Sequence, residues 1–120
     1  RPIFDTSSLS ILIAEFFIKN KKIGINYLKE INRIKEFMVK ECKKRKFNFI
    51  NTETNFFYIK IPSKNIKLVH SSLMKNKILV RSSLLGNFKF IDNTIRITLG
   101  QKKIMTKLFK ILDKINLDIK

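Results

Sequence analysis

Cysteine, histidine and glycine are scarce in this sequence of 120 residues, and their scarcity excludes several kinds of site. The single cysteine, Cys42, rules out a disulfide within the chain and fits a reducing compartment, so we expect a cytoplasmic protein. The single histidine, His70, provides no metal-binding cluster and no Ser-His-Asp or Cys-His arrangement for nucleophilic catalysis. The three glycines form neither a P-loop nor a dinucleotide-binding turn. The sequence by itself therefore contains no visible catalytic machinery.

Long apolar runs are absent as well. No stretch reaches the roughly 18 apolar residues of a transmembrane helix, and the start, "RPIFDTSS", lacks the pattern of a signal peptide. We therefore expect no membrane partner. The sequence does not begin with Met, so we also expect it to be a fragment of a longer protein.

Acidic residues are few: 9 Asp and Glu stand against 26 Lys and Arg, which gives a net charge of +17. Such a charge would usually place nucleic acid or an anionic membrane first among the partners. However, Lys, Ile, Asn and Phe, which A/T-rich codons encode, fill 63 of the 120 positions, and the lysines are spread along the whole chain. Much of the charge is therefore attributed to codon bias. Only 5 basic residues are Arg, whose planar fork of donors suits carboxylate or phosphate, so arginine is the more informative cation.

Hydrophobic periodicity divides the chain into helices and strands. Apolar residues at helical spacing predict helices over residues 6–20, 22–46, 63–77 and 101–115. Runs rich in Phe, Ile, Thr and Tyr predict one or two strands within 46–61, of which 55–61 is the firmer, and further strands at 78–81 and 94–100. Residues 82–93 are expected to be irregular, with a Gly-Asn turn signal.

The same periodicity predicts the core and the fold class. The second helix should bury Ile31, Ile34, Met38 and Cys42, and the third helix should bury Ile66, Val69, Leu73 and Met74. The last helix should bury Ile104, Leu108, Ile111, Leu112 and Ile115. Ser63 is a candidate N-terminal cap of the third helix. The order of elements predicts an α+β fold, in which a small, mainly antiparallel sheet of three to four strands is covered by helices. We expect a single domain over residues 1–120, since this length suits one ordinary core.

Arg96 stands in the middle of an apolar strand, "NTIRITLG". An unpaired charge is costly to bury. Alternation along the strand puts Ile95, Ile97 and Leu99 on the core face and Arg96 on the other. Two interpretations follow: Arg96 is a solvated arginine on a wet face, or it is held there for an anion.

Arg81 ends the predicted strand at 78–81, directly before Ser82 and Ser83. A strand end aims a side chain while the following loop leaves it accessible, which is common in ligand sites. Taken alone, Arg81 is either a surface arginine or a second cation that converges with Arg96 on one anion. His70 lies beside the apolar stripe of the third helix, which favours a packing or half-exposed role, and Cys42 lies on the core stripe of the second helix, which favours a structural role.

Four segments together resemble the C-terminal small domain of fold-type I pyridoxal-phosphate aminotransferases (class I/II), most closely the histidinol-phosphate aminotransferase family. "RPIFDTSSLSILIAEFFI" looks like the family's segment after the cofactor lysine, and "TETNFFYIKI" is similar to its Ser-x-x-Asn-Phe strand. "KNKILVRSS" resembles its Gly-Ile-x-Val-Arg, and "NTIRITLG" its Ile-Arg-Ile-Thr-x-Gly. The four blocks follow the family order and cover nearly the whole chain.

The resemblance implies roles that the residues alone do not. Arg96 matches the small-domain arginine that holds the substrate's carboxylate or phosphate, Arg81 matches a second arginine expected near the same anion, and Asn55 matches an Asn for which we expect a structural role. The family implies a substrate-clamping domain of a homodimeric, cytoplasmic transferase of amino-acid biosynthesis. Its pyridoxal 5'-phosphate would be bound mainly by a large domain preceding residue 1, which would also supply the Schiff-base lysine. The isolated chain is then expected to be inactive.

The sequence leaves three questions open. The resemblance does not identify the amino donor or acceptor, and it does not separate a transaminase from a decarboxylase of phosphorylated amino acids. A basic nucleic-acid-binding module is a rival interpretation, because Phe56 and Tyr58 share a strand face on which bases could stack. A non-catalytic interaction domain with the aminotransferase fold is a third.

Overall fold

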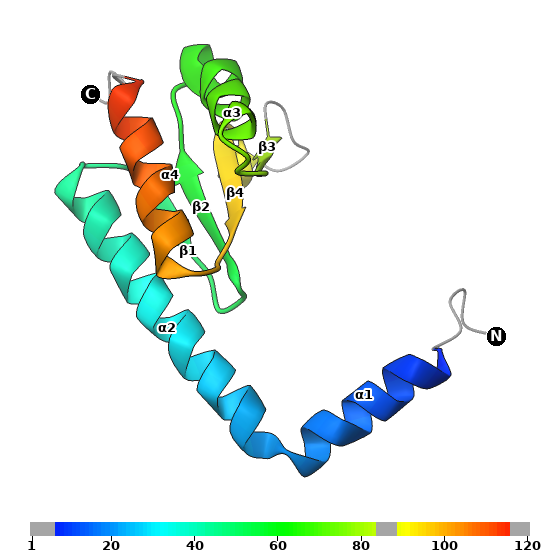
Figure 1. Cartoon of the computed structure of the whole chain (residues 1–120). Coiled ribbons are helices and arrows are strands. Elements are labelled where there is room, and N and C mark those ends of the chain that lie inside the picture. The colour runs from blue at the N-terminus through cyan, green and yellow to red at the C-terminus, as the bar shows by residue number, and fades with distance from the viewer. Residues whose placement is uncertain (1–6, 84–88, 116–120) are drawn as a thin grey trace.

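The structure of the chain, a computed structural model, describes residues 7–83 and 89–115. Its helices are α1 (Ser8–Lys19), α2 (Lys21–Lys44), α3 (Ile66–Lys75) and α4 (Lys102–Lys114) (Figure 1). Its strands are β1 (Phe49–Asn51), β2 (Phe56–Lys60), β3 (Arg81–Ser83) and β4 (Thr94–Thr98). Two short 3-10 turns complete the structure: η1 (Ser63–Asn65) precedes α3, and η2 (Lys89–Ile91) precedes β4.

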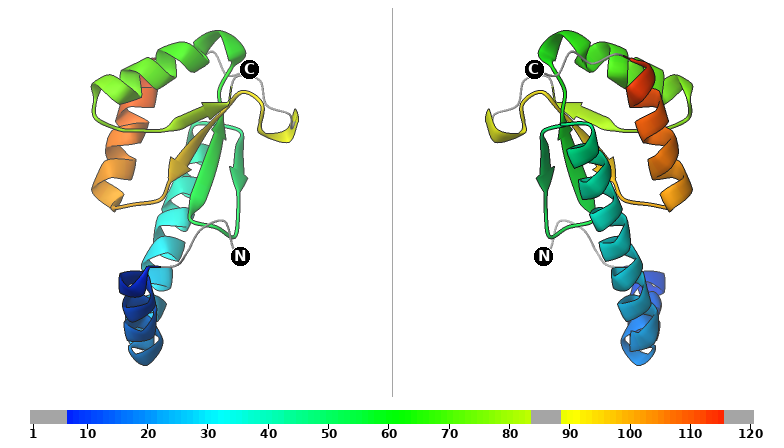
Figure 2. Two further views of the ribbon diagram at one scale, coloured as in Figure 1. Left: turned by 90° about the vertical axis from the view of Figure 1, so that its right-hand side faces the viewer. Right: turned by 90° about the vertical axis from the view of Figure 1, so that its left-hand side faces the viewer.

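The four strands form one antiparallel sheet in the order β1-β2-β4-β3. The body of α2, together with α3 and α4, lies on one face of this sheet, and no described helix covers the other face (Figures 1 and 2). The predicted α+β fold with a small antiparallel sheet under helices is therefore confirmed. The face without helices is called the open face below.

The inward-facing residues of the strands and the apolar faces of the helices form one hydrophobic core. Phe57 and Ile59 of β2 and Ile95 and Ile97 of β4 point toward the helices and are at most 2% exposed. The core also contains all four positions predicted on α2, namely Ile31, Ile34, Met38 and Cys42. Burial raises the pKa of the Cys42 thiol to about 12, so this cysteine is an inert core residue, as predicted.

Helices α2 and α3 end in the same way, and each end places an apolar residue in the core. Lys46 and Lys77 adopt left-handed φ angles of 57° and 61°. The next amides, of Phe47 and Ile78, donate to the carbonyls of Cys42 and Leu73 at 2.9 Å, the long-range bond of a Schellman cap. Phe47 and Ile78 are both buried, so each cap turns the chain into the following segment while covering the helix end.

Two boundary predictions are wrong. The strand expected at 78–81 is β3, which pairs with β4 only from Arg81 to Ser83, because Ile78 is buried as part of the α3 cap and not through strand pairing. Ser63 does not cap α3 with its side chain; it begins the 3-10 turn η1 after Pro62, and the α-helix starts at Ile66. The Gly-Asn turn signal within 82–93 lies outside the described residues.

Two core predictions on helices are also wrong. Met74 is 49% exposed, since the buried face of α3 consists of Ile66, Val69 and Leu73. Ile104 is 41% exposed, and its neighbour Met105 takes the buried position on α4. Phe109 joins the core although it was not predicted, and Ile115 is only partly buried.

Helix α1 projects away from the sheet together with the first turns of α2 (Figure 1). Its N-terminus is capped, because the Ser7 hydroxyl accepts from the amide of Ser10 at 3.2 Å. None of its residues is buried, and seven large apolar side chains are 48–67% exposed (Leu9, Ile11, Leu12, Ile13, Phe16, Phe17 and Ile18). In residues 7–83 and 89–115, no helix has both the length and the apolar character to span a membrane.

Arg45 joins the C-terminal ends of α2 and α4. Its Nε and Nη2 donate to the two carboxylate oxygens of Asp113 at 2.6 and 2.8 Å, and its Nη1 donates to Glu41 at 2.6 Å. Its Cζ also lies 4.8 Å from the centre of the Phe109 ring. The hydrogen bond from Arg45 lowers the pKa of the Asp113 carboxyl group, so the pair stabilises the fold when Asp113 is ionised.

Replacing Asp113 by Asn should lower the free energy of unfolding by about 1 kcal/mol at neutral pH, a modest loss because the carboxylate is partly exposed. Because the pKa of Asp113 is lower in the folded than in the unfolded protein, the carboxylate stabilises the fold fully at pH values above its unfolded-state pKa of about 3.9. This stabilisation is lost as the pH falls through the folded-state pKa. The difference between wild type and variant should therefore shrink below about pH 4 in urea unfolding experiments. Glu30→Gln is the control, because its 3.7 Å pair with Arg33 is highly exposed. A difference for Asp113→Asn that is independent of pH would contradict this account.

Candidate anion-binding site

Strand pairing brings both predicted arginines into one row on the open face. Arg96 of β4 lies directly opposite Arg81 of β3 on one side and Tyr58 of β2 on the other. Side chains directly opposite in an antiparallel pair share a face, so all three point away from the helices. As predicted, Arg96 is not in the core; it is half-buried, whereas Arg81 is exposed.

The row lies in a pocket of about 520 Å³ on this face. The pocket combines two guanidinium groups with hydroxyl groups and one apolar side chain, a donor-rich lining suited to an anion. Its lining residues are Tyr58, Arg81, Ser82, Ser83, Ile91, Thr94 and Arg96.

The two arginines are an electrostatic anomaly in the free protein. Like charges directly opposite each other on neighbouring strands destabilise the pairing. Within the described residues, neither Arg81 nor Arg96 forms an ion pair with a carboxylate. Arg96 instead lies over the ring of Phe56, with its Cζ 4.5 Å from the ring centre. Two unneutralised cations that share a pocket form a site that a carboxylate or phosphate can complete.

A buried threonine holds one wall of the pocket. Thr94 is on the same strand face as Arg96 yet is only 1% exposed, and its hydroxyl donates to the carbonyl of Ile91 at 2.6 Å. This bond fastens the turn η2, which ends at Ile91, to the first residue of β4. The apolar wall that Ile91 provides is therefore fixed relative to the arginines.

The other residues singled out from the sequence lie away from the pocket. The backbone carbonyl of Asn55 accepts from the amide of Leu99 at 2.8 Å and so extends the β2–β4 ladder. His70 is half-buried on α3. In the described part of the chain, no group of three or more His, Cys, Asp or Glu residues could hold a metal ion.

Two further residues belong to the surroundings of Arg96: Tyr58 lines the pocket, and Phe56 lies under the Arg96 guanidinium. Their strand and their common face were visible in the alternation of "NFFYIKI". What was missing was the register of β2 against β4, which places Tyr58 opposite Arg96 and Phe56 opposite Thr98. Ser83 also lines the pocket, because the register of β3 places it opposite Thr94.

Comparison with known proteins relates the chain to aminotransferases, and the resemblance predicted from the sequence is confirmed. The chain is similar to histidinol-phosphate aminotransferases in particular. Over 96% of its length it is 31% identical to histidinol-phosphate aminotransferase of Aliarcobacter butzleri (strain RM4018). Over 100% of its length it is 29% identical to histidinol-phosphate aminotransferase of Clostridium novyi (strain NT). The matches cover 30% and 33% of these proteins, so the chain spans about a third of the length of the curated relatives it matches. No family model matches the chain.

Replacing Arg81 by Gln should stabilise the free protein by about 0.5 kcal/mol, because it removes the repulsion from Arg96. The gain should fall as NaCl is raised, since salt screens exposed charges. Thermal unfolding at low and high NaCl measures both effects. Arg33→Gln on the exposed side of α2 serves as the control for loss of one positive charge. A less stable Arg81→Gln variant at low salt would show that no net repulsion exists.

Proposed function

We propose that the chain is the substrate-clamping C-terminal domain of a cytoplasmic, pyridoxal-phosphate-dependent aminotransferase similar to histidinol-phosphate aminotransferase. The observation that carries the proposal is the row of Arg81, Arg96 and Tyr58 in one pocket of the open face. The similarity to two histidinol-phosphate aminotransferases over nearly the whole chain gives this pocket a chemical context. The full enzyme would be a homodimer that transfers an amino group between an amino acid or amino phosphate and a 2-oxo acid.

In this function Arg96 and Arg81 bind the anionic end of the substrate, a carboxylate or a phosphate. Two guanidinium forks from neighbouring strands approach one anion from two directions and fix its orientation. A substrate held at its anionic end presents its amino group in a defined position, which lowers the entropic part of the barrier.

The cofactor would be held mainly by another domain of the full enzyme. Among the side chains that the structure describes, no lysine lines the pocket that contains the arginines. Pyridoxal 5'-phosphate would supply carbanion stabilisation, and this chain would contribute substrate binding and orientation. The chain alone is accordingly expected not to catalyse transamination.

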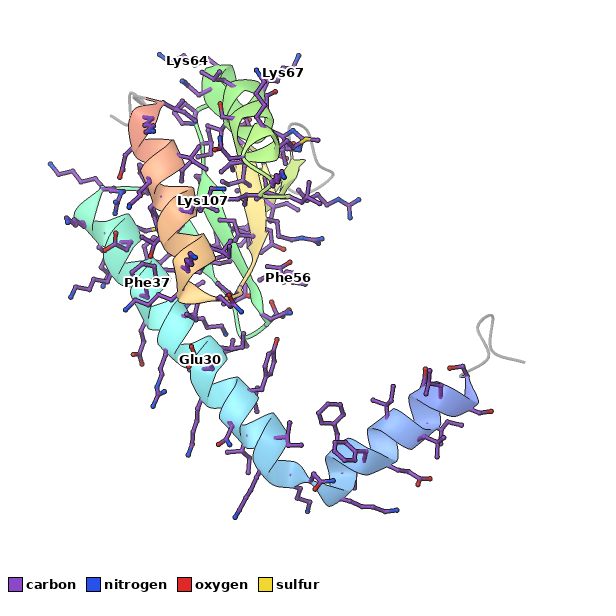
Figure 3. The ribbon with its side chains drawn as sticks, viewed as in Figure 1. Glu30, Phe37, Phe56, Lys64, Lys67 and Lys107 are labelled. Carbon is purple, nitrogen blue, oxygen red and sulfur yellow. The ribbon has the colours of Figure 1, made fainter. Side chains whose placement is uncertain are left out.

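The apolar surface of α1 supports a place within a larger protein. Seven of its residues are exposed Leu, Ile or Phe, and Figure 3 shows side chains projecting from this helix away from the rest of the protein. A helix in which apolar residues extend beyond a single stripe is typical of a protein interior. The curated relatives are about three times as long as the part that the chain matches. A neighbouring domain that covers α1 fits both observations.

Arg96→Ala, introduced into an active aminotransferase that contains this chain, should raise KM for the amino donor at least about tenfold. The loss corresponds to roughly 1.4 kcal/mol or more of transition-state stabilisation. Steady-state kinetics with a panel of amino acids and amino phosphates measure the effect and identify the donor. Arg33→Ala should leave KM unchanged, because Arg33 lies on α2 and is not among the residues that line the pocket. Unchanged kinetics for Arg96→Ala would refute the proposed clamp.

A nucleic-acid-binding module is the second candidate, and the open face gives it one supporting observation. Phe56 and Tyr58 are partly exposed there beside Arg96, in an arrangement on which bases could stack. However, a guanidinium already lies over the Phe56 ring, so a stacked base would have to displace it. Tight binding of single-stranded RNA with a steep salt dependence would favour this candidate over the aminotransferase clamp.

A further inference from the structure

Arg96, one of the pocket arginines, contacts the aromatic ring of Phe56. Phe56 lies opposite Thr98, so its ring reaches diagonally along the strands to the guanidinium of Arg96. In Figure 3, Phe56 lies beside the end of β4 and away from α4, on the side of the open face. The ring is therefore outside the hydrophobic core and close to the candidate anion site.

Without this ring, little in the described structure would fix the Arg96 side chain. Among residues 7–83 and 89–115, it makes no side-chain hydrogen bond or ion pair. Arg81 directly opposite repels it, and a free arginine side chain carries about 2 kcal/mol of rotamer entropy. A guanidinium over an aromatic ring is attracted by the π electrons, and an arginine held in this way can still donate its N–H groups to another partner.

Arg45 provides a precedent for this geometry within the same molecule. Its Cζ lies 4.8 Å from the Phe109 ring, close to the 4.5 Å of Arg96 over Phe56. The edge of Arg45 meets both oxygens of Asp113 at 2.6 and 2.8 Å. Arg96 has the ring but, within the described residues, no carboxylate at its edge. The comparison indicates that an oxyanion would complete the arrangement at Arg96 as Asp113 does at Arg45.

We propose that Phe56 is a positioning residue, whose ring holds the Arg96 guanidinium beside Arg81 so that both arginines bind the same anion. This inference rests on the proposed function of Arg96 as an anion-binding residue. The role assigned to Phe56, the first Phe of the "TNFFYIKI" segment, depends on its aromatic ring and not on its apolar volume. Another aromatic residue at position 56 should therefore preserve anion binding, whereas an aliphatic residue of comparable volume should weaken it.

The test compares Phe56→Leu, which removes the ring, with Phe56→Tyr, which retains it, and Thr98→Val as the matched control opposite Phe56. Inorganic phosphate is titrated into each 120-residue protein, and binding is followed by NMR. We expect Phe56→Leu to weaken phosphate binding about two- to fivefold, the range that corresponds to a partly exposed cation–π contact. Phe56→Tyr and Thr98→Val should bind as the wild type does.

A second measurement tests the ring contact without any anion. Protons of the Arg96 side chain that lie over a ring should show upfield chemical shifts in the free wild-type protein, and these shifts should disappear in Phe56→Leu. Random-coil shifts for Arg96 in the wild type would overturn the inference, whether or not phosphate binds and even if the variant does not fold.

The outcomes separate this inference from the proposed function. If Arg96→Ala loses phosphate binding while Phe56→Leu binds like the wild type, the clamp stands and the positioning role of Phe56 is refuted. If Arg96→Ala binds phosphate as tightly as the wild type does, the clamp itself is refuted. Weakened binding in Phe56→Leu with wild-type binding in Phe56→Tyr supports the positioning role, because leucine keeps an apolar side chain at this position and lacks only the aromatic ring.

Discussion

The antiparallel pairing of β2 with β4 determines both the core and the candidate site. Phe57 lies opposite Ile97 and Ile59 opposite Ile95, and all four face the helices. A slip of one residue in either strand would turn its apolar side chains to the open face, at about 1.5–3 kcal/mol for each side chain. The core therefore fixes the register, and the register in turn fixes which side chains share the open face: Phe56, Tyr58 and Arg96.

The same energies explain why two arginines can stand opposite each other. Repulsion between like charges on neighbouring strands amounts to about 0.2–1 kcal/mol, which is small beside the burial of even one of the core residues on β4. The sheet therefore tolerates Arg81 beside Arg96 without a carboxylate from the described residues. An anion that binds between them would relieve the repulsion and gain two forked contacts at once, so the free sheet is already arranged for such a ligand.

Sequence periodicity predicts the parts of the fold in which one residue type recurs at a fixed spacing. The buried residues of α2 and the alternation of β4 are of this kind, and both are confirmed. Prediction fails where burial has another cause. Ile78 is buried by a helix cap and not by strand pairing, and of the adjacent apolar residues Ile104 and Met105 only the packing of α4 decides which one is buried.

The candidate site is predictable only in part for a related reason. Alternation takes Arg96 off the core face, and the position of Arg81 at the end of an apolar run suggests an accessible side chain. Their direct opposition, and the inclusion of Tyr58, depend on how three strands pair. That information is distributed over the whole core and is not contained in any one strand.

The use of arginine in this lysine-rich chain follows the geometry of the contacts. Where a cation meets a single carboxylate in solvent, either residue serves: Arg33 with Glu30 and Lys19 with Glu15 both form pairs at 3.7 Å. Arg45 makes two kinds of contact at once: its Cζ lies over an aromatic ring, and its Nε and Nη2 donate to two carboxylate oxygens. A lysine ammonium is a point charge and cannot do both in one orientation. Arg96 has the same relation to a ring as Arg45, so a planar cation at this position is explained if its edge also meets a two-oxygen acceptor.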